Sequence, residues 1–197
     1  MNNRKVYISG EIVSEADAKI SIFDSAVLLG DTVTESTRTF NFKPFKLDEH
    51  LERLYKSFKL TRIDPQMTIE EMKKVSLDLL EINKDDYKAN EDCWLVHNIS
   101  RGHSITGGNP TLQVSKPTVM IYTQPMNLVS WAPFYRKGCH AVTPPTRMVP
   151  SQSLDARIKN RSRLFYTLAE IEAKLVDPDA QCVILDIHGN VAENKGG

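Results

Sequence analysis

The sequence predicts an α+β fold in two domains. Strand-like segments alternate with segments whose apolar residues recur at helical spacing, and a stretch rich in proline and aromatic residues interrupts them. Proline limits both helix formation and pairing in central strands, so this stretch is a natural connection between domains. We therefore expect a first domain over residues 1–124, a connection over 125–137 and the start of a second domain over 138–197.

The first domain is predicted to contain four strand-like runs and two helices. The strand-like runs cover residues 5–13, 33–47, 93–100 and 117–124. Helical periodicity covers residues 48–61 and 68–82. In the first helix Leu51, Leu54 and Phe58 mark the buried face, and Arg53 falls away from the centre of that face.

The second domain is predicted to begin with a helix and a hairpin. Apolar residues recur at helical spacing after Arg163, at Leu164, Leu168, Ile171 and Leu175. The apolar run over 180–187 predicts a strand, and His188-Gly-Asn190 predicts a turn that sends the chain back. This arrangement would place Glu193 beside the end of a buried strand and Lys159 just before the helix.

A single lysine, Lys159, lies among Arg157, Arg161 and Arg163. Neighbouring cations disfavour a further positive charge, so we expect Lys159 to lose its proton readily and to expose a nucleophilic amine. An amine of this kind forms Schiff bases. On charge alone, a solvated basic start to a helix is the more frequent meaning of such a run.

The order of these segments resembles the class IV, fold-type IV, pyridoxal-phosphate-dependent aminotransferases. This family includes branched-chain and D-amino acid aminotransferases and, as a non-transferring relative, aminodeoxychorismate lyase. The resemblance covers nearly the whole chain. It is carried by the segments 30–38, 43–47, 50–54, 158–159, 168–173, 180–186 and 189–193.

The resemblance assigns three residues to the cofactor, pyridoxal 5'-phosphate. Lys159 would form the Schiff base and move the substrate's α-proton as a general base. Arg53 would grip the phosphate through its planar guanidinium, and Glu193 would face the pyridine nitrogen and keep it protonated. Taken alone, Arg53 could instead be a surface arginine paired with Glu49 or Glu52, and Glu193 a solvated acid.

The function that the resemblance implies is transfer of an amino group between an amino acid and a 2-oxo acid, by a homodimer. The chain is expected to be cytoplasmic because it shows no signal peptide or membrane span. Branched-chain amino acids are candidate substrates, but Leu164 stands where the branched-chain enzymes carry a tyrosine. Leu29 and Thr34 replace expected aromatic residues, and Thr34 is a candidate substrate-binding residue. The alternatives are a lyase-like enzyme and an inactive or truncated member of the family.

Arg101 and His103 follow a predicted strand, where functional side chains often lie. One of them could meet the substrate carboxylate, directly or from a partner subunit. The alternative is a structural arginine beside a solvent-facing histidine. We expect His97, within the strand, to be a buried structural histidine.

Composition excludes several other classes of protein. The chain has 197 residues, 41% hydrophobic content and 25 charges of each sign, as expected for a globular protein with a sizeable core. Zero net charge argues against nucleic acid or an anionic membrane as the main partner. No signal peptide, membrane span or metal site is expected, and Cys93, Cys139 and Cys182 are expected to be buried free thiols. Because the sequence stops just after Glu193, we expect an incomplete second domain that lacks part of the phosphate site.

Overall fold

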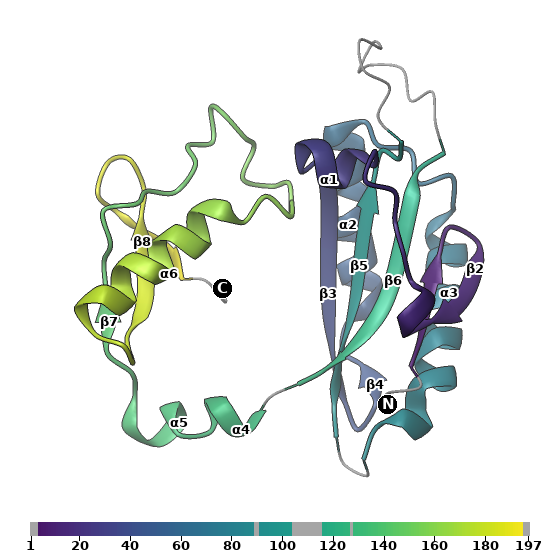
Figure 1. Ribbon diagram of the computed structural model, residues 1–197, viewed down its shortest axis with the longest axis horizontal. Helices are drawn as coiled ribbons and strands as arrows, with labels where there is room; N and C mark the ends of the chain where they lie inside the picture. The colour runs from purple at the N-terminus through teal and green to yellow at the C-terminus, as the bar shows by residue number, and fades with distance from the viewer. Residues whose placement is uncertain (1–3, 89–90, 104–115, 127, 195–197) are drawn as a thin grey trace. The chain divides into compact units, whose positions relative to one another are not determined.

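The computed structural model describes residues 4–88, 91–103, 116–126 and 128–194. It has the predicted α+β class and divides into two compact units. Unit 1 comprises residues 1–126 together with the segment Ile158–Ser162, and unit 2 comprises residues 127–157 and 163–197 (Figure 1). The predicted connection over 125–137 contains two short helices, α4 (Leu128–Trp131) and α5 (Phe134–Lys137).

Unit 1 is built on a six-stranded antiparallel sheet. Its strands are β1 (Lys5–Ile8), β2 (Glu11–Ser14), β3 (Thr32–Phe40), β4 (Lys43–Pro44), β5 (Cys93–Ser100) and β6 (Thr118–Pro125), in the order β2-β1-β6-β5-β3-β4. Two predicted runs are hairpins rather than single strands. Positive φ angles at Ser9 and Gly10 turn the first, and positive φ angles at Asn41 and Phe42 turn the second.

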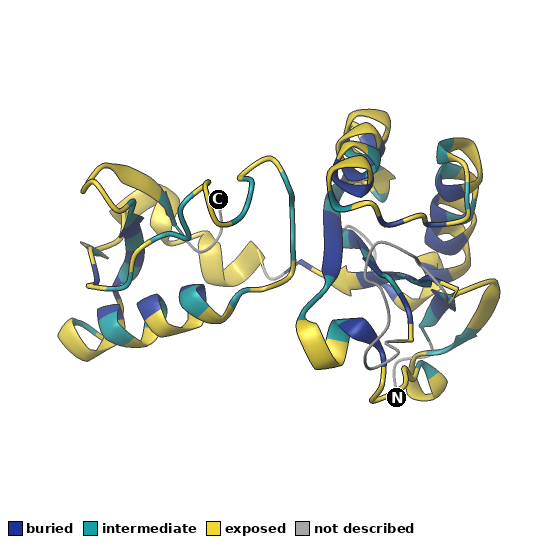
Figure 2. Ribbon diagram, turned by 90° about the horizontal axis from the view of Figure 1, so that it is seen from above, coloured by how far each residue is buried: buried dark blue, intermediate teal, exposed yellow. Residues whose placement is uncertain are grey.

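Two long helices cover one face of this sheet (Figures 1 and 2). They are α2 (Leu47–Thr61) and α3 (Ile69–Asn83), each within one residue of its predicted bounds. A capping box begins α3, because the Thr68 hydroxyl accepts from the Glu71 backbone N–H at 3.2 Å and the Glu71 carboxylate accepts from that of Thr68 at 2.7 Å. Shorter helical turns are α1 (Ser25–Leu29), η1 (Glu15–Asp17) and η2 (Lys84–Asp86).

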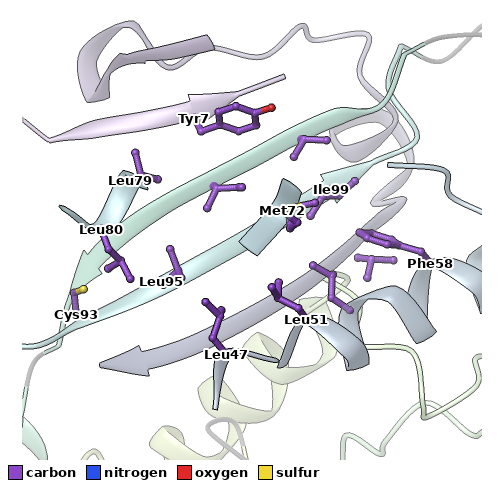
Figure 3. Close-up of a cluster of buried hydrophobic side chains, with 14 of the residues drawn as sticks. Tyr7, Leu47, Leu51, Phe58, Met72, Leu79, Leu80, Cys93, Leu95 and Ile99 are labelled. Carbon is purple, nitrogen blue, oxygen red and sulfur yellow. The ribbon is translucent and has the colours of Figure 1, made fainter. Parts of the chain in front are cut away.

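The main core lies between these helices and the sheet (Figure 3). From α2 it receives Leu51, Leu54 and Phe58, the three residues predicted to be buried. Alternate residues of each strand point to the same face, so Cys93, Leu95 and Ile99 of β5 meet the helices. Trp94 and Asn98 of β5 belong to the opposite face, which α2 and α3 do not cover.

The segment Ile158–Ser162 completes one edge of the sheet. Thr34 N–H donates to the Lys159 carbonyl at 2.8 Å, and Arg161 N–H donates to the Thr32 carbonyl at 3.0 Å. Between them Asn160 forms an antiparallel bridge with Val33. The segment therefore runs beside β3 as a short antiparallel strand and satisfies backbone groups at its edge.

Unit 2 contains a smaller, three-stranded sheet and one long helix. The strands are β7 (Ala141–Val142), β8 (Gln181–Leu185) and β9 (Val191–Asn194), with β7 and β8 parallel and β8 and β9 antiparallel. The helix is α6 (Leu164–Val176). The predicted helix, strand, turn and returning strand are thus all present. The unit's core consists of Tyr166, Ala169, Ala173, Cys182 and Ile184.

One prediction about the cysteines is wrong. Cys93 and Cys182 are buried free thiols, as expected, but Cys139 is exposed. It lies before β7, which has only two residues and provides little cover for it. Within the described parts of the chain, no helix is long and apolar enough to cross a membrane.

Candidate active site

The backbone of Lys159 is held between β3 and α2. Its carbonyl accepts from Thr34, and its N–H donates to the Ser57 hydroxyl at 3.4 Å. Ser57 is buried in α2 and in turn donates to the Arg53 carbonyl at 3.1 Å. A hydrogen-bonded series therefore links the backbone of Lys159 to that of Arg53, one helical turn before Ser57.

The Arg53 side chain is held by Glu35, a partner that the sequence did not suggest. Arg53 Nε donates to Glu35 Oε2 at 2.7 Å, and Arg53 Nη2 donates to Glu35 Oε1 at 2.6 Å. Glu35 is fully buried, whereas the Arg53 side chain is 51% exposed. This bidentate pair fixes one edge of the guanidinium and leaves Nη1 outside the pair. The two sequence-based candidates have other partners, since Glu49 pairs with Lys46 and Glu52 with Lys56.

Glu35 remains a carboxylate despite its burial. Burial by itself raises the pKa of Glu35. Hydrogen bonds from Arg53 and from the Ser36 backbone, together with the charges of Arg53 and His50, outweigh that effect and hold the pKa below its ordinary value. His50 Nδ1 lies 3.1 Å from Glu35 Oε1 and completes this cluster.

Glu193 lies on β9 opposite Ile184. It is half-buried, and its carboxylate accepts a hydrogen bond from the Tyr166 hydroxyl. Burial, followed by this hydrogen bond and the negative charge of Glu193, raises the pKa of Tyr166 well above its ordinary value. Tyr166 therefore stays protonated as a donor and orients the carboxylate.

The arginines around Lys159 have separate partners. Arg157 pairs with Asp155, with Nη2 and Oδ2 2.6 Å apart. The Arg163 guanidinium carbon lies 4.0 Å from the centre of the Tyr166 ring, and Arg161 bonds to side chains of the sheet. The basic run is therefore three distinct contacts rather than one solvated face.

The remaining predicted site residues lie near one end of the sheet. Arg101 forms a bidentate pair with Asp31, with Nε and Oδ2 2.9 Å apart, and also donates to the backbone carbonyls of Thr61 and Arg62. His103 is exposed and packs edge-on against Phe23, with ring centroids 5.8 Å apart. Their role in substrate binding stays a prediction.

His97 and Thr34 occupy opposite faces of the sheet. His97 is fully buried, with Nε2 2.8 Å from the Ser76 hydroxyl, and burial lowers its pKa to about 4. Nδ1 of His97 has no hydrogen-bond partner in the described residues. The Thr34 hydroxyl contacts the carbonyl of His97 and Oδ1 of Asn98, at 2.9 and 2.7 Å.

Sequence reasoning missed Glu35, Ser57 and Tyr166. A signal for Glu35 was present, because strand alternation puts it on the same face as the apolar Val33 and so toward α2. Ser57 likewise lies one turn after Arg53. Among the described residues, no group of three or more histidine, cysteine or acidic side chains is placed to hold a metal ion.

The chain belongs to the class IV aminotransferase family, which it matches over residues 32–195. A protein of Methanocaldococcus jannaschii named "Putative branched-chain-amino-acid aminotransferase" is 34% identical over 192 residues, or 98% of this chain and 63% of that protein. The D-alanine aminotransferase of Staphylococcus aureus is 31% identical over 120 residues, which cover 61% of this chain and 41% of that enzyme.

Solved structures confirm the fold-type IV architecture. The T.th. branched-chain amino acid aminotransferase, complexed with N-(5'-phosphopyridoxyl)-L-glutamate, superposes with a TM-score of 0.82 at 24% identity, over 98% of this chain and 62% of that one. The Thermoproteus uzoniensis branched-chain aminotransferase with norvaline gives a TM-score of 0.77 at 24% identity, over 97% and 62%. This chain thus spans less than two thirds of the length of these relatives.

Proposed function

We propose that the chain carries the pyridoxal-phosphate site of an aminotransferase that moves an amino group between an amino acid and a 2-oxo acid. The main support is the hydrogen-bonded series from Arg53 through Ser57 to Lys159. It connects the backbones of the two residues whose side chains are proposed to bind the cofactor's aldehyde and phosphate. Membership of the class IV aminotransferase family points to the same chemistry.

The donor set fits pyridoxal 5'-phosphate. A phosphorylated aldehyde needs an amine for its carbonyl and a cation for its phosphate, and Lys159 and Arg53 supply these groups. Glu35 holds one edge of the Arg53 guanidinium, so the remaining N–H groups are oriented before an anion arrives. The crystal structures of the T.th. relative include complexes with N-(5'-phosphopyridoxyl)-L-glutamate and with pyridoxamine 5'-phosphate.

Lys159, Arg53 and Glu193 each have a separate role in the proposed reaction. The bound cofactor supplies an electrophilic carbonyl and an electron sink for transamination. Lys159 would hold the cofactor through its amine, and the same amine would move the substrate's α-proton as a general base. Arg53 anchors the phosphate. Glu193, oriented by Tyr166, keeps a proton on the pyridine nitrogen.

Branched-chain amino acids and D-alanine are the amino donors to test first, because relatives of both kinds match this chain. The functional form is proposed to be a homodimer. Leu164, in place of the tyrosine of branched-chain enzymes, keeps a lyase-like activity as the second candidate. Formation of a 2-oxo acid together with pyridoxamine 5'-phosphate, without lyase product, would indicate transfer rather than elimination.

Covalent labelling tests the proposal without requiring turnover. The 197-residue chain is incubated with pyridoxal 5'-phosphate, reduced with borohydride and mapped by peptide mass spectrometry. We expect the added mass on the peptide that contains Lys159, and its loss in both Lys159→Ala and Lys159→Arg, because guanidinium stays protonated.

Lys174→Ala, an exposed change in α6, is the matched control and should label like wild type. Wild-type chain that acquires no label, or label that persists in Lys159→Ala, would refute the assignment of Lys159.

A further inference from the structure

Lys159 and Arg161 belong to the sheet face that α2 and α3 leave uncovered. The bridge between Asn160 and Val33 sets Lys159 opposite Thr34, and residues opposite each other in antiparallel strands share a face. Thr34 is in turn opposite Asn98, and Asn98 is opposite Met120. Lys159, Thr34, Asn98 and Met120 therefore form a row across neighbouring strands. Because neighbouring strands lie about 4.8 Å apart, the backbones of Lys159 and Asn98 are about 10 Å apart. Because side chains alternate, Arg161 lies on the same face.

Arg161 is held on this face by two neutral side chains. Its Nε donates to Asn98 Oδ1 at 3.1 Å, and its Nη2 lies 3.5 Å from the Tyr122 hydroxyl. The side chain is exposed, and in the part of the chain that the structure describes it forms no ion pair with a carboxylate. A guanidinium oriented by neutral groups keeps its full charge and still has N–H groups with which to bind an anion.

The Tyr122 hydroxyl adds a second donor. The hydroxyl oxygen accepts from Asn98 Nδ2 at 2.9 Å and from Arg161 Nη2 at 3.5 Å. Asn98 Oδ1 accepts from Thr34 and Arg161, which fixes the amide orientation that makes Nδ2 the donor to Tyr122. The Tyr122 proton is thereby left for another acceptor. Arg161 and Tyr122 together present only donors.

A cavity of about 640 Å³ borders this cluster, within the size range of small-molecule sites. Asn98 and Tyr122 belong to its lining. The charged residues of the lining are Arg4, Lys5 and Glu15, of which Arg4 and Glu15 pair at 2.9 Å. The lining therefore has an excess of positive charge, which favours an anionic ligand.

We propose that Arg161, supported by Asn98 and Tyr122, binds a carboxylate of the substrate on the face that it shares with Lys159. The inference rests on the proposed function and names a specificity-determining residue for it. A carboxylate matches both the planar fork of Arg161 and the Tyr122 hydroxyl. Arg161 lies two residues from Lys159 in the same short strand, so their backbones are about 7 Å apart on one face, close enough for one small ligand to reach both side chains.

A substrate can provide this carboxylate from its α-position or from its side chain. Titrating the cofactor-free 197-residue chain with simple acids, and following the Arg161 Nε–H and the Asn98 side-chain amide by NMR, distinguishes these sources. The probes are glutarate, which has two carboxylates, 4-methylvalerate, which has one, and the uncharged 4-methylpentan-1-ol. Binding of glutarate alone identifies a side-chain carboxylate site, whereas binding of both acids identifies an α-carboxylate site.

We expect Arg161→Leu to weaken acid binding about tenfold or more, and Tyr122→Phe to weaken it by a smaller factor. Arg161→Lys should restore only part of the affinity, because an ammonium cannot form the fork. Arg157→Leu is the matched control. It removes an exposed arginine two residues before Lys159 that is already paired with Asp155, so acid binding should not change.

The inference fails if no acid binds at millimolar concentration, if the alcohol binds as well as the acids, or if Arg161→Leu and Arg157→Leu behave alike. These outcomes are independent of covalent labelling. Label on Lys159 with no effect of Arg161→Leu would overturn only the carboxylate site. Acid binding through Arg161 without label would instead refute the proposed function.

Discussion

The two units contain helices of similar sequence periodicity but bury them very differently. In unit 1, α2 packs Leu51, Leu54 and Phe58 against a six-stranded sheet. In unit 2, α6 buries Tyr166, Ala169 and Ala173, whereas the leucine and isoleucine residues whose spacing predicted the helix are exposed. Leu164 is 73% exposed and Leu175 82%. Periodicity thus predicts that a helix forms, but the surface available to it decides which face is covered.

The two units also share a structural feature, a supporting side chain that orients a proposed site residue. Unit 1 contains the proposed cofactor residues Arg53 and Lys159, and unit 2 contains Glu193. In each unit a neighbouring side chain orients one of these groups. Glu35 fixes the Arg53 guanidinium in unit 1, and Tyr166 fixes the Glu193 carboxylate in unit 2. Neither supporting residue was in the set deduced from sequence. Side chains that bind a ligand are often held in position by neighbouring residues that do not touch the ligand themselves.

The largest expected difference between the units is the effect of removing a leucine. Leu54→Ala opens a cavity in a fully buried site and should lower the free energy of unfolding by about 2–5 kcal/mol. Leu175→Ala removes an exposed side chain and should change it by less than about 0.5 kcal/mol. Guanidinium denaturation measures both.

Tryptophan reporters keep the two measurements apart. With Trp131→Phe, fluorescence of Trp94 in β5 reports on unit 1; with Trp94→Phe, fluorescence of Trp131 in α4 reports on unit 2. A large loss in Leu175→Ala would mean that the stripe on α6 is covered in solution, and the contrast between the units would disappear.

The second prediction concerns the core of unit 1 at low pH. Burial lowers the pKa of His97 from 6.5 to about 4, so the unfolded chain binds a proton that the folded chain excludes. Stability should therefore fall as the pH drops from 6.5 to 4, by up to about 3 kcal/mol. Urea denaturation across this range should show the slope, and His97→Gln should remove it.

His188→Gln, in the exposed turn of unit 2, is the control and should leave the slope unchanged. Glu35 contributes in a lower window. Because its pKa is held below the ordinary value of 4.5, its stabilising effect is lost only as the pH falls below that value. An unchanged slope in His97→Gln would show that His97 is not the titrating group.

Local signals predicted most of the fold. The bounds of α2, α3 and β5 agree with the sequence to within one residue, because hydrophobic periodicity and β-branched content are local properties. The hairpin at Ser9 and Gly10 was missed although Ser-Gly is a turn signal. The pairing of 158–162 with β3 could not be predicted, since it joins segments more than a hundred residues apart.

The candidate site likewise contains residues that the sequence predicted and residues that only the tertiary structure revealed. Lys159, Arg53 and Glu193 came from motif order, and their roles remain predictions. Glu35, Ser57 and Tyr166 depend on long-range packing. The Arg161 cluster needs three strands in register with the segment 158–162 before its members meet. Chemical types can thus be found along a sequence, but the partners that orient them depend on tertiary structure.

The third prediction tests the role of the Arg53 guanidinium, which Glu35 orients in unit 1. Arg53→Lys keeps a positive charge but loses the fork, so we expect weaker cofactor binding by up to about 1.5–3 kcal/mol. Comparing pyridoxal 5'-phosphate with pyridoxal isolates the phosphate. The preference for the phosphorylated form should shrink in Arg53→Lys and persist in Lys56→Ala, an exposed change on the same helix. An unchanged preference would remove Arg53 from the phosphate site.

The prediction with the smallest expected effect tests the hydrogen bond between Tyr166 and Glu193 in unit 2. Tyr166→Phe removes a hydroxyl that is nearly inaccessible to water and that donates to Glu193, and it should cost about 1 kcal/mol of stability. Glu193→Gln should cost a similar amount, since the amide replaces a charge-assisted acceptor with a neutral one. If the two groups act through one hydrogen bond, the double variant should lose clearly less than the sum of the single losses. Additive losses would mean that Tyr166 packs in the core of unit 2 without orienting Glu193. Coupling would instead show that the carboxylate is already held by its own unit, as Arg53 is by Glu35.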